Sequence, residues 1–443
     1  MLLPRKTAWT LLCLLALLAF TDKRQAGPSS ALASLIDFHR PELSIPVSAD
    51  PVAPILLPTA KAALPDRPSF AYLSDPDHAL GGFYQALRRT AEGGPSTRIL
   101  HYGDSPVTAD SITSDLRELL QQRFGDGGHG FVLIAKPWAW YSHRGVEIQS
   151  QGWHSEPSSM GTRARDGLHG IGGVSFEGGS GAFSALRLES DHSRVEIAFL
   201  KHRLGGVFTV QASGQTLGSV NTADPRVRAG WAAFDLPEGA RKLRIQVQSG
   251  AVRLFGVSLE TASPGVIYNS LGLNGGQVPV IVHYFDRDHW AEQLRHYRPD
   301  LVVLNYGANE SVFPKYLDTL YPNELRQVIE RVKDALPHVS ILLMGLMDRG
   351  ERGSNGEIET VATIPRIVAM QHGAADQTGC AFFDTYTAMG GAGTMGRWYA
   401  ARPQLVTADF LHPFPAGARK VGLLLDDALA GGYERYQPTR SGR

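Results

Sequence analysis

The sequence predicts an α/β protein with a doubly wound parallel sheet, into which a separate all-β segment is inserted. In the first and last parts of the chain, short continuous apolar runs alternate with helical patterns, as expected for parallel strands buried on both faces. From about Trp138 to Glu260 the pattern changes to short runs of alternating polar and apolar residues, separated by glycine and turn residues. This second pattern is typical of an antiparallel sandwich.

The parallel sheet is expected to begin with the apolar run 98–102, which stops abruptly at Gly103. Helices are expected where apolar residues recur on one face, over 77–91, 110–124 and 323–336. Later runs repeat the strand pattern at 265–268, 301–304, 340–344 and 380–383. Strands and helices in this alternation form one parallel sheet, whose functional sites lie beyond the carboxyl ends of the strands.

The chain of 443 residues is long enough for two domains and tails. Prolines at high density after the N-terminal segment exclude long helices and predict a linker or extended arm. We therefore expect five parts: a signal peptide or N-terminal anchor (1–26), a proline-rich linker (27–75), the first part of the α/β domain (76–139), the inserted β sandwich (140–262) and the second part of the α/β domain (263–435).

The N-terminus predicts export, to the periplasm or the cell exterior. Arg5 and Lys6 precede the apolar run 8–20, which has the length of a signal-peptide core and is short for a membrane span. No clear cleavage site follows, so an uncleaved membrane tether remains open as an alternative. If the segment is removed, Cys380 is the only cysteine left, and no intramolecular disulfide can form.

The composition indicates neither nucleic acid nor a cofactor or metal as a partner. Lys+Arg and Asp+Glu both number 43, so there is no basic surplus. Residues 125–130 match the G-x-G-x-x-G dinucleotide pattern, but they follow a helix and open a strand, so we interpret them as a tight loop. The histidines and aspartates of 283–296 lack a recognised ligand spacing, which favours a solvated loop over a metal site.

Four segments that carry polar, chemically useful residues follow the expected strands or lie in the final loop. Ser105 follows the first strand, in Gly-Asp-Ser, and Gly275 lies in the glycine-rich segment after the second. Asn309 follows the third, in Gly-Ala-Asn-Glu. Asp409 and His412 lie three residues apart near the C-terminus, so that one loop can present both.

Together these residues supply the groups that acyl transfer requires: a nucleophile, a base, an orienting acid and oxyanion donors. Ser105 would attack an ester carbonyl, His412 would accept its proton, and Asp409 would fix the imidazole tautomer. The backbone N–H groups of Ser105 and Gly275 and the side-chain amide of Asn309 would bind the oxyanion. Each of these motifs alone is more often structural. The hypothesis of acyl transfer depends on their occurring together.

These four blocks resemble the SGNH (GDSL-type) hydrolases. The resemblance covers residues 97 to about 430, with the β segment as an insertion, and implies a flavodoxin-like sheet of five parallel strands and the same residue roles. There are two departures: Glu310 stands where the family more often has aspartate, and Pro106 follows the serine. In the glycine-rich segment, the resemblance assigns the oxyanion role to Gly275, with Gly272 and Gly276 as the alternatives.

The arrangement also resembles exported SGNH enzymes with an inserted β sandwich similar to a carbohydrate-binding module, among which are peptidoglycan O-acetylesterases. This implies an exported serine esterase that removes O-acetyl groups from peptidoglycan or another polysaccharide. Two alternatives remain open: an O-acetyltransferase that uses the same acyl-enzyme, and a wall-binding protein with an inactive hydrolase domain. We further hypothesise that the insert docks beside the active-site mouth. The aromatic cluster near its start (Trp138, Trp140, Tyr141 and Trp153) either stacks on sugars or packs in a core.

Overall fold

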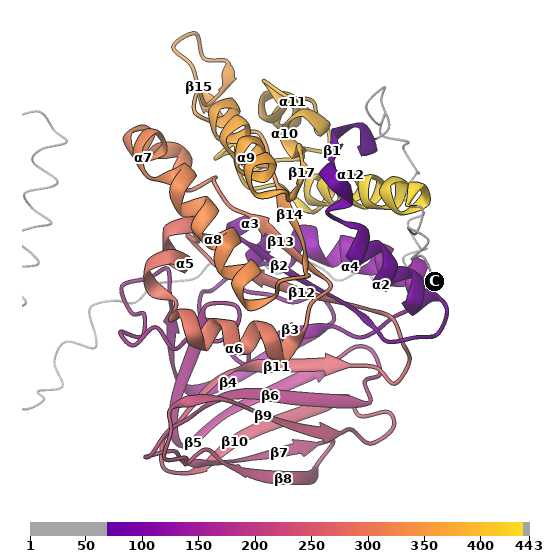
Figure 1. Cartoon of the computed structure of the whole chain (residues 1–443). Helices are drawn as coiled ribbons and strands as arrows, with labels where there is room; N and C mark the ends of the chain where they lie inside the picture. Colours follow the sequence, from indigo (N-terminus) through magenta and orange to yellow (C-terminus); the bar gives the residue numbers. More distant parts are fainter. Residues whose placement is uncertain (1–68, 437–443) are drawn as a thin grey trace, which may run out of the picture. The chain divides into compact units, whose positions relative to one another are not determined.

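The structure of the protein is a computed structural model that describes residues 69–436. The expected signal peptide or anchor and most of the expected linker lie outside the described residues. The part that is described contains a parallel sheet with helices on both faces and a large antiparallel sheet (Figure 1). No helix within residues 69–436 is both long enough and apolar enough to cross a membrane.

The central sheet of the α/β part has five parallel strands in the order β12-β2-β13-β14-β17. Counted along the chain, this is the 2-1-3-4-5 order of flavodoxin-like folds, so the expected fold class is confirmed. The short strand β1 adds antiparallel to β17 at the edge. The strands are β1 (Leu73–Ser74), β2 (Thr97–Gly103), β12 (Val266–Gly272), β13 (Leu301–Asn305), β14 (Ser340–Met344) and β17 (Ala381–Phe383).

Two helical layers cover this sheet, which explains the continuous apolar runs in its strands. Side chains of successive strand residues point to opposite faces, so Ile99 packs in one layer while Leu100 packs in the other. The first layer contains α2 (Gly81–Ala91), α4 (Ser111–Phe124) and α12 (Pro415–Arg435). The second contains α5 (Val278–Tyr284), α6 (Arg287–Tyr297), α8 (Tyr321–Ala335) and α9 (Ile364–Thr378).

The inserted segment and β3, which lies just before it, form one continuous antiparallel sheet of nine strands, in the order β8-β7-β10-β5-β11-β6-β9, with β3 paired to β11 and β4 to β5. Its two end strands come into contact, and the ring of Phe234 in β9 lies against Gly218 in β8. The curled sheet therefore encloses its own core, as a sandwich does. The strands are β3 (Gly130–Val132), β4 (Val146–Pro157), β5 (Val174–Leu188), β6 (Arg194–Lys201), β7 (Val207–Ala212), β8 (Gln215–Asn221), β9 (Arg228–Asp235), β10 (Lys242–Ser249) and β11 (Val252–Glu260).

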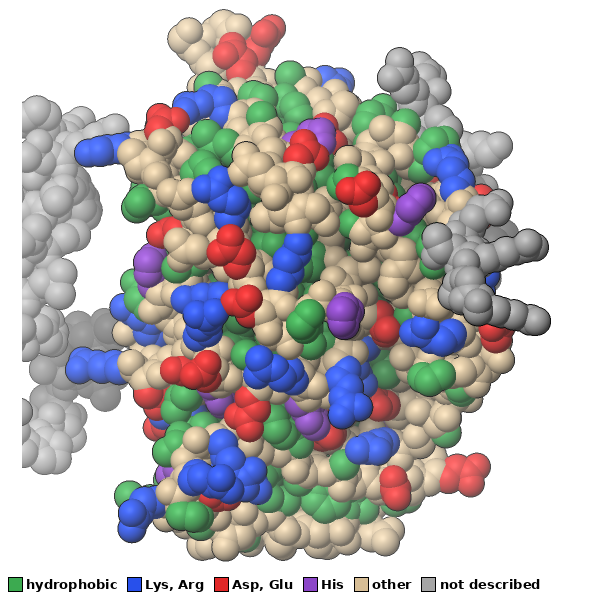
Figure 2. Space-filling model, in the orientation of Figure 1, with side chains coloured by type: hydrophobic (Ala, Val, Ile, Leu, Met, Phe, Trp, Pro, Cys, Tyr) green, Lys and Arg blue, Asp and Glu red, His purple; other side chains and the backbone are tan. Residues whose placement is uncertain are grey.

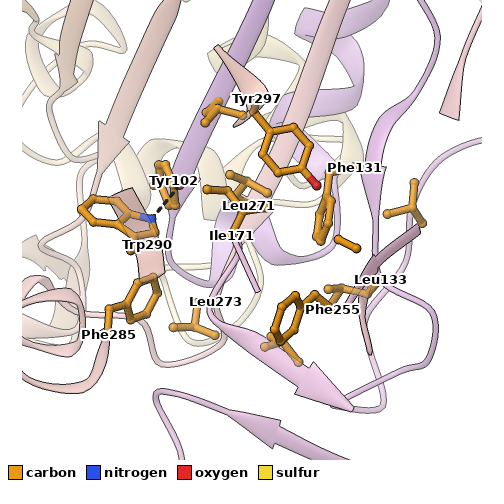
Figure 3. Close-up of a cluster of buried hydrophobic side chains, with 14 of the residues drawn as sticks. Tyr102, Phe131, Leu133, Ile171, Phe255, Leu271, Leu273, Phe285, Trp290 and Tyr297 are labelled. Carbon is orange, nitrogen blue, oxygen red and sulfur yellow. Dashed lines mark hydrogen bonds between the residues drawn. The ribbon is translucent and has the colours of Figure 1, made fainter. Parts of the chain in front are cut away.

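The antiparallel sheet and the second helical layer share one hydrophobic core (Figure 3). Phe131 of β3 lies edge-on to Tyr297 of α6, with their ring centroids 6.1 Å apart. On the same side, the indole N–H of Trp290 donates a hydrogen bond to the Tyr102 hydroxyl at 3.1 Å. Because apolar residues of both parts bury one another, each part depends on the other for the burial of its core.

The remaining elements are short. The glycine-rich segment 125–130 is a turn that connects α4 to β3, and the N–H of Gly128 donates to the Asp126 carboxylate at 2.8 Å. Acidic and basic side chains are interspersed over the face shown in Figure 2. The short elements are η1 (Ser69–Tyr72), η2 (Pro76–His78), α3 (Ser105–Thr108), η3 (Glu310–Val312), α7 (Pro314–Thr319), β15 (Gly350–Arg352), β16 (Ile358–Thr360), α10 (Thr385–Ala388) and α11 (Thr394–Ala400).

Candidate active site

Ser105 lies at the tight turn that joins β2 to α3, at the carboxyl edge of the parallel sheet. The turn folds back so closely that a Cβ atom on Gly103 would lie 2.5 Å from a methyl group of Val107. Only glycine fits at position 103, which explains why the strand ends there. The Val107 N–H donates to the carbonyl oxygen of Asp104 and closes the turn. Ser105 is thereby held at the start of a helix, next to the topological switch point between β2 and β13.

The structure brings Ser105, His412 and Asp409 into one hydrogen-bonded chain. Ser105 Oγ lies 2.7 Å from His412 Nε2, and His412 Nδ1 lies 2.6 Å from Asp409 Oδ2. The three residues come from two segments about 300 positions apart, the β2–α3 turn and the loop before α12. This is the geometry in which a histidine can take the serine proton while a carboxylate orients the ring.

Asp409 is held as a carboxylate by the loop that carries it. Its Oδ1 accepts hydrogen bonds from the Thr407 hydroxyl at 2.5 Å and from the N–H groups of Leu411 and His412, both at 3.0 Å. Partial burial acts to raise the pKa of Asp409, but hydrogen bonds from Thr407, His412 and the backbone outweigh it and lower this pKa well below its usual range. The Thr407 N–H also donates to the His412 carbonyl oxygen at 2.9 Å and closes the loop.

Phe410, between Asp409 and His412 in this loop, has a left-handed backbone with φ of 56°. Such a conformation is unfavourable for a residue with a Cβ atom and persists only where its surroundings impose it. The buried ring of Phe410 packs edge-on against Tyr399, with centroids 4.9 Å apart, and its carbonyl oxygen accepts the Gly350 N–H at 2.9 Å. The anchored phenylalanine therefore fixes the turn that lets Asp409 and His412 meet.

A pocket of about 490 Å³ opens above the serine. Trp140 contributes the exposed rim, with 56% of its surface accessible, whereas Trp138 and Tyr141 are buried in the core. The core role is thus observed for Trp138 and Tyr141, and stacking of Trp140 on a sugar stays a prediction. The lining residues are Ser105, Pro106, Ala109, Ser111, Trp140, Asn274, Gly275, Asn309, His412 and Pro413.

Of the three candidate glycines at and after the end of β12, only Gly275 lines this pocket. It has a φ of 66°, and a Cβ atom placed on it would meet no atom within 4 Å. Gly272 instead packs tightly against the backbone of Thr108, where a Cβ atom would lie 2.3 Å from the nitrogen. The N–H of Gly276 is used in a turn to the Leu273 carbonyl oxygen at 2.8 Å.

Asn309 lines the pocket from the segment after β13. Its side-chain Nδ2 donates to the carbonyl oxygen of Gly276 at 2.9 Å, which fixes the amide with its nitrogen toward the glycine-rich loop. A side-chain amide carries two N–H donors. The second is therefore available to a group bound in the pocket.

Two buried carboxyl groups lie beneath the same loops. Burial raises the pKa of Asp104 to about 7, partly offset by a hydrogen bond from the Ala308 N–H. Burial also raises the pKa of Glu310 to about 8, against a hydrogen bond from the Val278 N–H at 2.8 Å, and the charge of Asp104 adds to the rise. Glu310 thus ties the Asn309 segment to the start of α5, directly after the Gly275 loop.

The histidines of 283–296 make structural contacts, and the expectation of a solvated loop is wrong, because the segment lies mostly in α5 and α6 and His289 is buried. His283 pairs with Glu324 at 2.8 Å and His296 with Glu196 at 2.8 Å, while His289 Nε2 lies 3.0 Å from a backbone carbonyl oxygen. In the described part of the chain, no group of three or more His, Cys, Asp or Glu residues is arranged to hold a metal ion.

Sequence reasoning missed two contributors to the site. Thr407 supports Asp409 from two positions away, a spacing that could have drawn attention to it. Ser159 belongs to the insert, and its hydroxyl donates to the carbonyl oxygen of Asn274 at 2.6 Å. No pattern in the sequence marks Ser159.

A larger groove of about 630 Å³ lies on the antiparallel sheet and is lined by Arg187, Lys242 and Arg244 among others. None of the residues of the four sequence motifs lines this groove.

Comparison with known proteins agrees with this geometry. Residues 244–420 match the family model of the GDSL-like lipase/acylhydrolase family, a stretch that includes Gly275, Asn309, Asp409 and His412 but not Ser105. No curated protein sequence matches the chain significantly. A solved structure titled "Peptidoglycan O-acetylesterase in action, 5 min" is 25% identical, covers 82% of this chain and 99% of its own, and superposes with a TM-score of 0.70.

Other solved structures are similar at lower scores. A Bacillus subtilis protein is 15% identical over 64% of this chain and 90% of its own, with a TM-score of 0.33. A family two carbohydrate esterase from Clostridium thermocellum is 13% identical over 65% of this chain and 100% of its own, with a TM-score of 0.28. TM-scores this low support no further conclusion. The family-model match, the 0.70 superposition and the strand order together support the resemblance to the SGNH (GDSL-type) hydrolases and the assignment as a carboxylic ester hydrolase.

Proposed function

We propose that the protein is an exported serine esterase that removes O-acetyl groups from peptidoglycan or another polysaccharide. The observation that carries the proposal is the hydrogen-bonded chain from Ser105 through His412 to Asp409, which opens into a pocket with two candidate oxyanion donors beside it. The similar solved structure titled as a peptidoglycan O-acetylesterase supports the substrate class.

In the proposed mechanism, Ser105 Oγ attacks the acetyl carbonyl carbon while its proton passes to His412 Nε2. The negative charge that develops on the carbonyl oxygen is stabilised by the N–H groups of Ser105 and Gly275 and by the Asn309 amide. The tetrahedral intermediate collapses, and His412 returns the proton to the departing sugar hydroxyl. Water, deprotonated by the same histidine, then hydrolyses the acetyl-serine and releases acetate.

The shape of the pocket mouth supports a polymeric substrate. Trp140, whose side chain is exposed, is one of the residues that line the pocket. An aromatic ring at the rim can stack on the apolar face of a sugar while the acetyl group enters toward Ser105. A pocket of about 490 Å³ is ample for an acetyl group and the sugar that carries it.

A substrate panel tests the proposal. Acetate release is measured from p-nitrophenyl acetate, O-acetylated peptidoglycan and acetylated xylan, with and without a sugar acceptor, for the wild type and for Ser105→Ala. Release of acetate from peptidoglycan by the wild type alone supports the esterase. Transfer to the acceptor in preference to water would identify an O-acetyltransferase, and no turnover of any ester would leave the inactive wall-binding alternative.

Export is part of the same proposal and rests on the apolar run 8–20 after Arg5 and Lys6. Fractionation of cells that produce the full chain should place it outside the cytoplasm. Release from membranes by salt alone would contradict an uncleaved tether, and retention in the cytoplasm would contradict export.

A further inference from the structure

One residue of the insert contacts the proposed oxyanion loop directly. The Ser159 hydroxyl donates a hydrogen bond of 2.6 Å to the carbonyl oxygen of Asn274. That carbonyl and the N–H of Gly275 belong to the same peptide group. Because a peptide group is planar and its C=O and N–H point in opposite directions, fixing one of them fixes the other.

Gly275 has little else to hold it in place. It is exposed, its φ is 66°, and no atom lies within 4 Å of the position that a Cβ atom would occupy. Packing therefore does not set the direction of its N–H. The flanking contacts act on other peptide groups: the Gly276 N–H donates to the Leu273 carbonyl oxygen, and Asn309 donates to the Gly276 carbonyl oxygen. Within residues 69–436, the hydrogen bond from Ser159 is the contact that acts on the Asn274–Gly275 peptide itself.

Ser159 is in turn fixed to the α/β part. It lies in the segment between β4 and β5, whose Gly167 carbonyl oxygen accepts the Asp286 N–H at 3.0 Å. The His169 carbonyl oxygen of the same segment accepts the side-chain amide of Gln293 at 2.9 Å. Ile171 is fully buried in the shared core (Figure 3). The hydroxyl of Ser159 is thus presented from a rigid support, which is what preorganisation of an oxyanion donor requires.

We propose that Ser159 is a positioning residue of the active site: its hydrogen bond to Asn274 aims the Gly275 N–H at the oxyanion and polarises it. The proposal rests on the proposed esterase function and deepens it, since it makes the insert a contributor to catalysis as well as a neighbour of the site. A hydrogen bond to the carbonyl of a peptide group also strengthens the N–H of that group as a donor. The effect belongs to the transition state, where charge on the substrate oxygen is greatest.

The test compares Ser159→Ala with Ser158→Ala. Ser158 is the adjacent residue, and its buried Oγ has no hydrogen-bond partner among the described residues, so its removal is a matched loss of one hydroxyl. For Ser159→Ala we expect kcat on p-nitrophenyl acetate to fall about 3- to 10-fold, the worth of one hydrogen bond, with KM nearly unchanged. Ser158→Ala should keep the wild-type kcat, and Ser159→Thr should restore most of the loss.

Inhibition by benzeneboronic acid separates positioning from a general loosening of the fold. Its adduct with the Ser105 oxygen is tetrahedral at boron and places an oxygen where the oxyanion would lie. The affinity for this inhibitor should fall in Ser159→Ala by the same factor as kcat, whereas the affinity for acetate should not change.

Wild-type kcat and wild-type boronate affinity in Ser159→Ala would overturn the inference and leave the proposed function intact. An equal loss in Ser158→Ala, or a rise in KM with unchanged kcat, would also overturn it. Failure of the proposed function gives a different result: either the wild type itself turns over no ester, or Ser105→Ala retains the activity of the wild type.

Discussion

The two halves of the candidate site are built in opposite ways. The base half is a single loop, 407–413, in which the side chains of His412 and Asp409 are 41% and 51% exposed. Asp409 accepts hydrogen bonds from residues within three positions, and buried Phe410 anchors the loop. The oxyanion half is assembled from segments far apart in the chain and rests on buried Asp104 and Glu310, which are 3% and 0% exposed. A local motif can fix a histidine, whereas aiming backbone N–H groups requires support from the whole fold.

Ser105 belongs to both halves, so its removal should have the largest effect. We expect Ser105→Ala and His412→Ala each to abolish turnover of an acetyl ester, because nucleophile and base act as one unit. The double variant should be no worse than either single variant. Steady-state rates on p-nitrophenyl acetate measure the effect, and circular dichroism verifies the fold. Near wild-type turnover by either variant would contradict the mechanism.

Asn309→Ala alters the oxyanion half of the site and leaves the base half unchanged. It removes one of the proposed donors and also the hydrogen bond from Asn309 to the Gly276 carbonyl oxygen. We expect kcat to fall on the order of 10²- to 10³-fold, the usual effect of losing one oxyanion donor, with little change in KM. A normal kcat with a raised KM would show instead that Asn309 binds the substrate.

The same contrast explains how much of the molecule the sequence could predict. The parallel strands were found because strands buried on both faces are continuous apolar runs, and the Asp409–His412 pair because its partners lie three residues apart. The N–H donor was uncertain among three glycines because only the close packing of Gly272 on Thr108 and the opening of Gly275 to the pocket distinguish them.

Contacts between distant segments could not be predicted. Ser159 reaches Asn274 across 115 positions, and nothing in the local sequence of either marks the pair. The aromatic cluster before β4 gave no sign that Trp140 would be exposed at the pocket while Trp138 is buried. The sharing of one core by the insert and α6 likewise depends on the tertiary arrangement. Deleting the insert would expose this core, so point variants such as Ser159→Ala test its role better than a deletion.

Thr407→Val tests the base half of the site by removing one of the hydrogen bonds within its loop. Valine keeps the size of threonine but removes the hydrogen bond to Asp409 Oδ1, one of three that this oxygen accepts from the loop. We expect kcat to fall about 3- to 10-fold, since the remaining two hydrogen bonds keep the carboxylate oriented. Thr407→Ser, which retains the hydroxyl, should behave like the wild type. A loss as large as that of His412→Ala would mean that the loop is less self-sufficient than its hydrogen bonds indicate.

Glu310→Gln should have the smallest effect on turnover and a distinct effect on stability. Burial raises the pKa of Glu310 from its ordinary 4.5 to about 8, so near neutral pH the folded protein holds a proton there that the unfolded chain has lost. The stability that belongs to the protonated group is fully present below pH 4.5 and is lost as the pH rises toward 8. Glutamine keeps an oxygen for the Val278 N–H and cannot ionise.

Relative to the variant, the free energy of unfolding of the wild type should therefore fall between pH 5 and 8, by up to about 1.4 kcal/mol per pH unit. Urea denaturation of the wild type and of Glu310→Gln at several pH values measures this difference. At pH 6 the kcat of Glu310→Gln should stay within about 3-fold of the wild type, because the carboxyl group is already neutral there. Parallel stability curves for variant and wild type would show that Glu310 is ionised in the folded protein, and the oxyanion half would then rest on a buried charge instead of a buried acid.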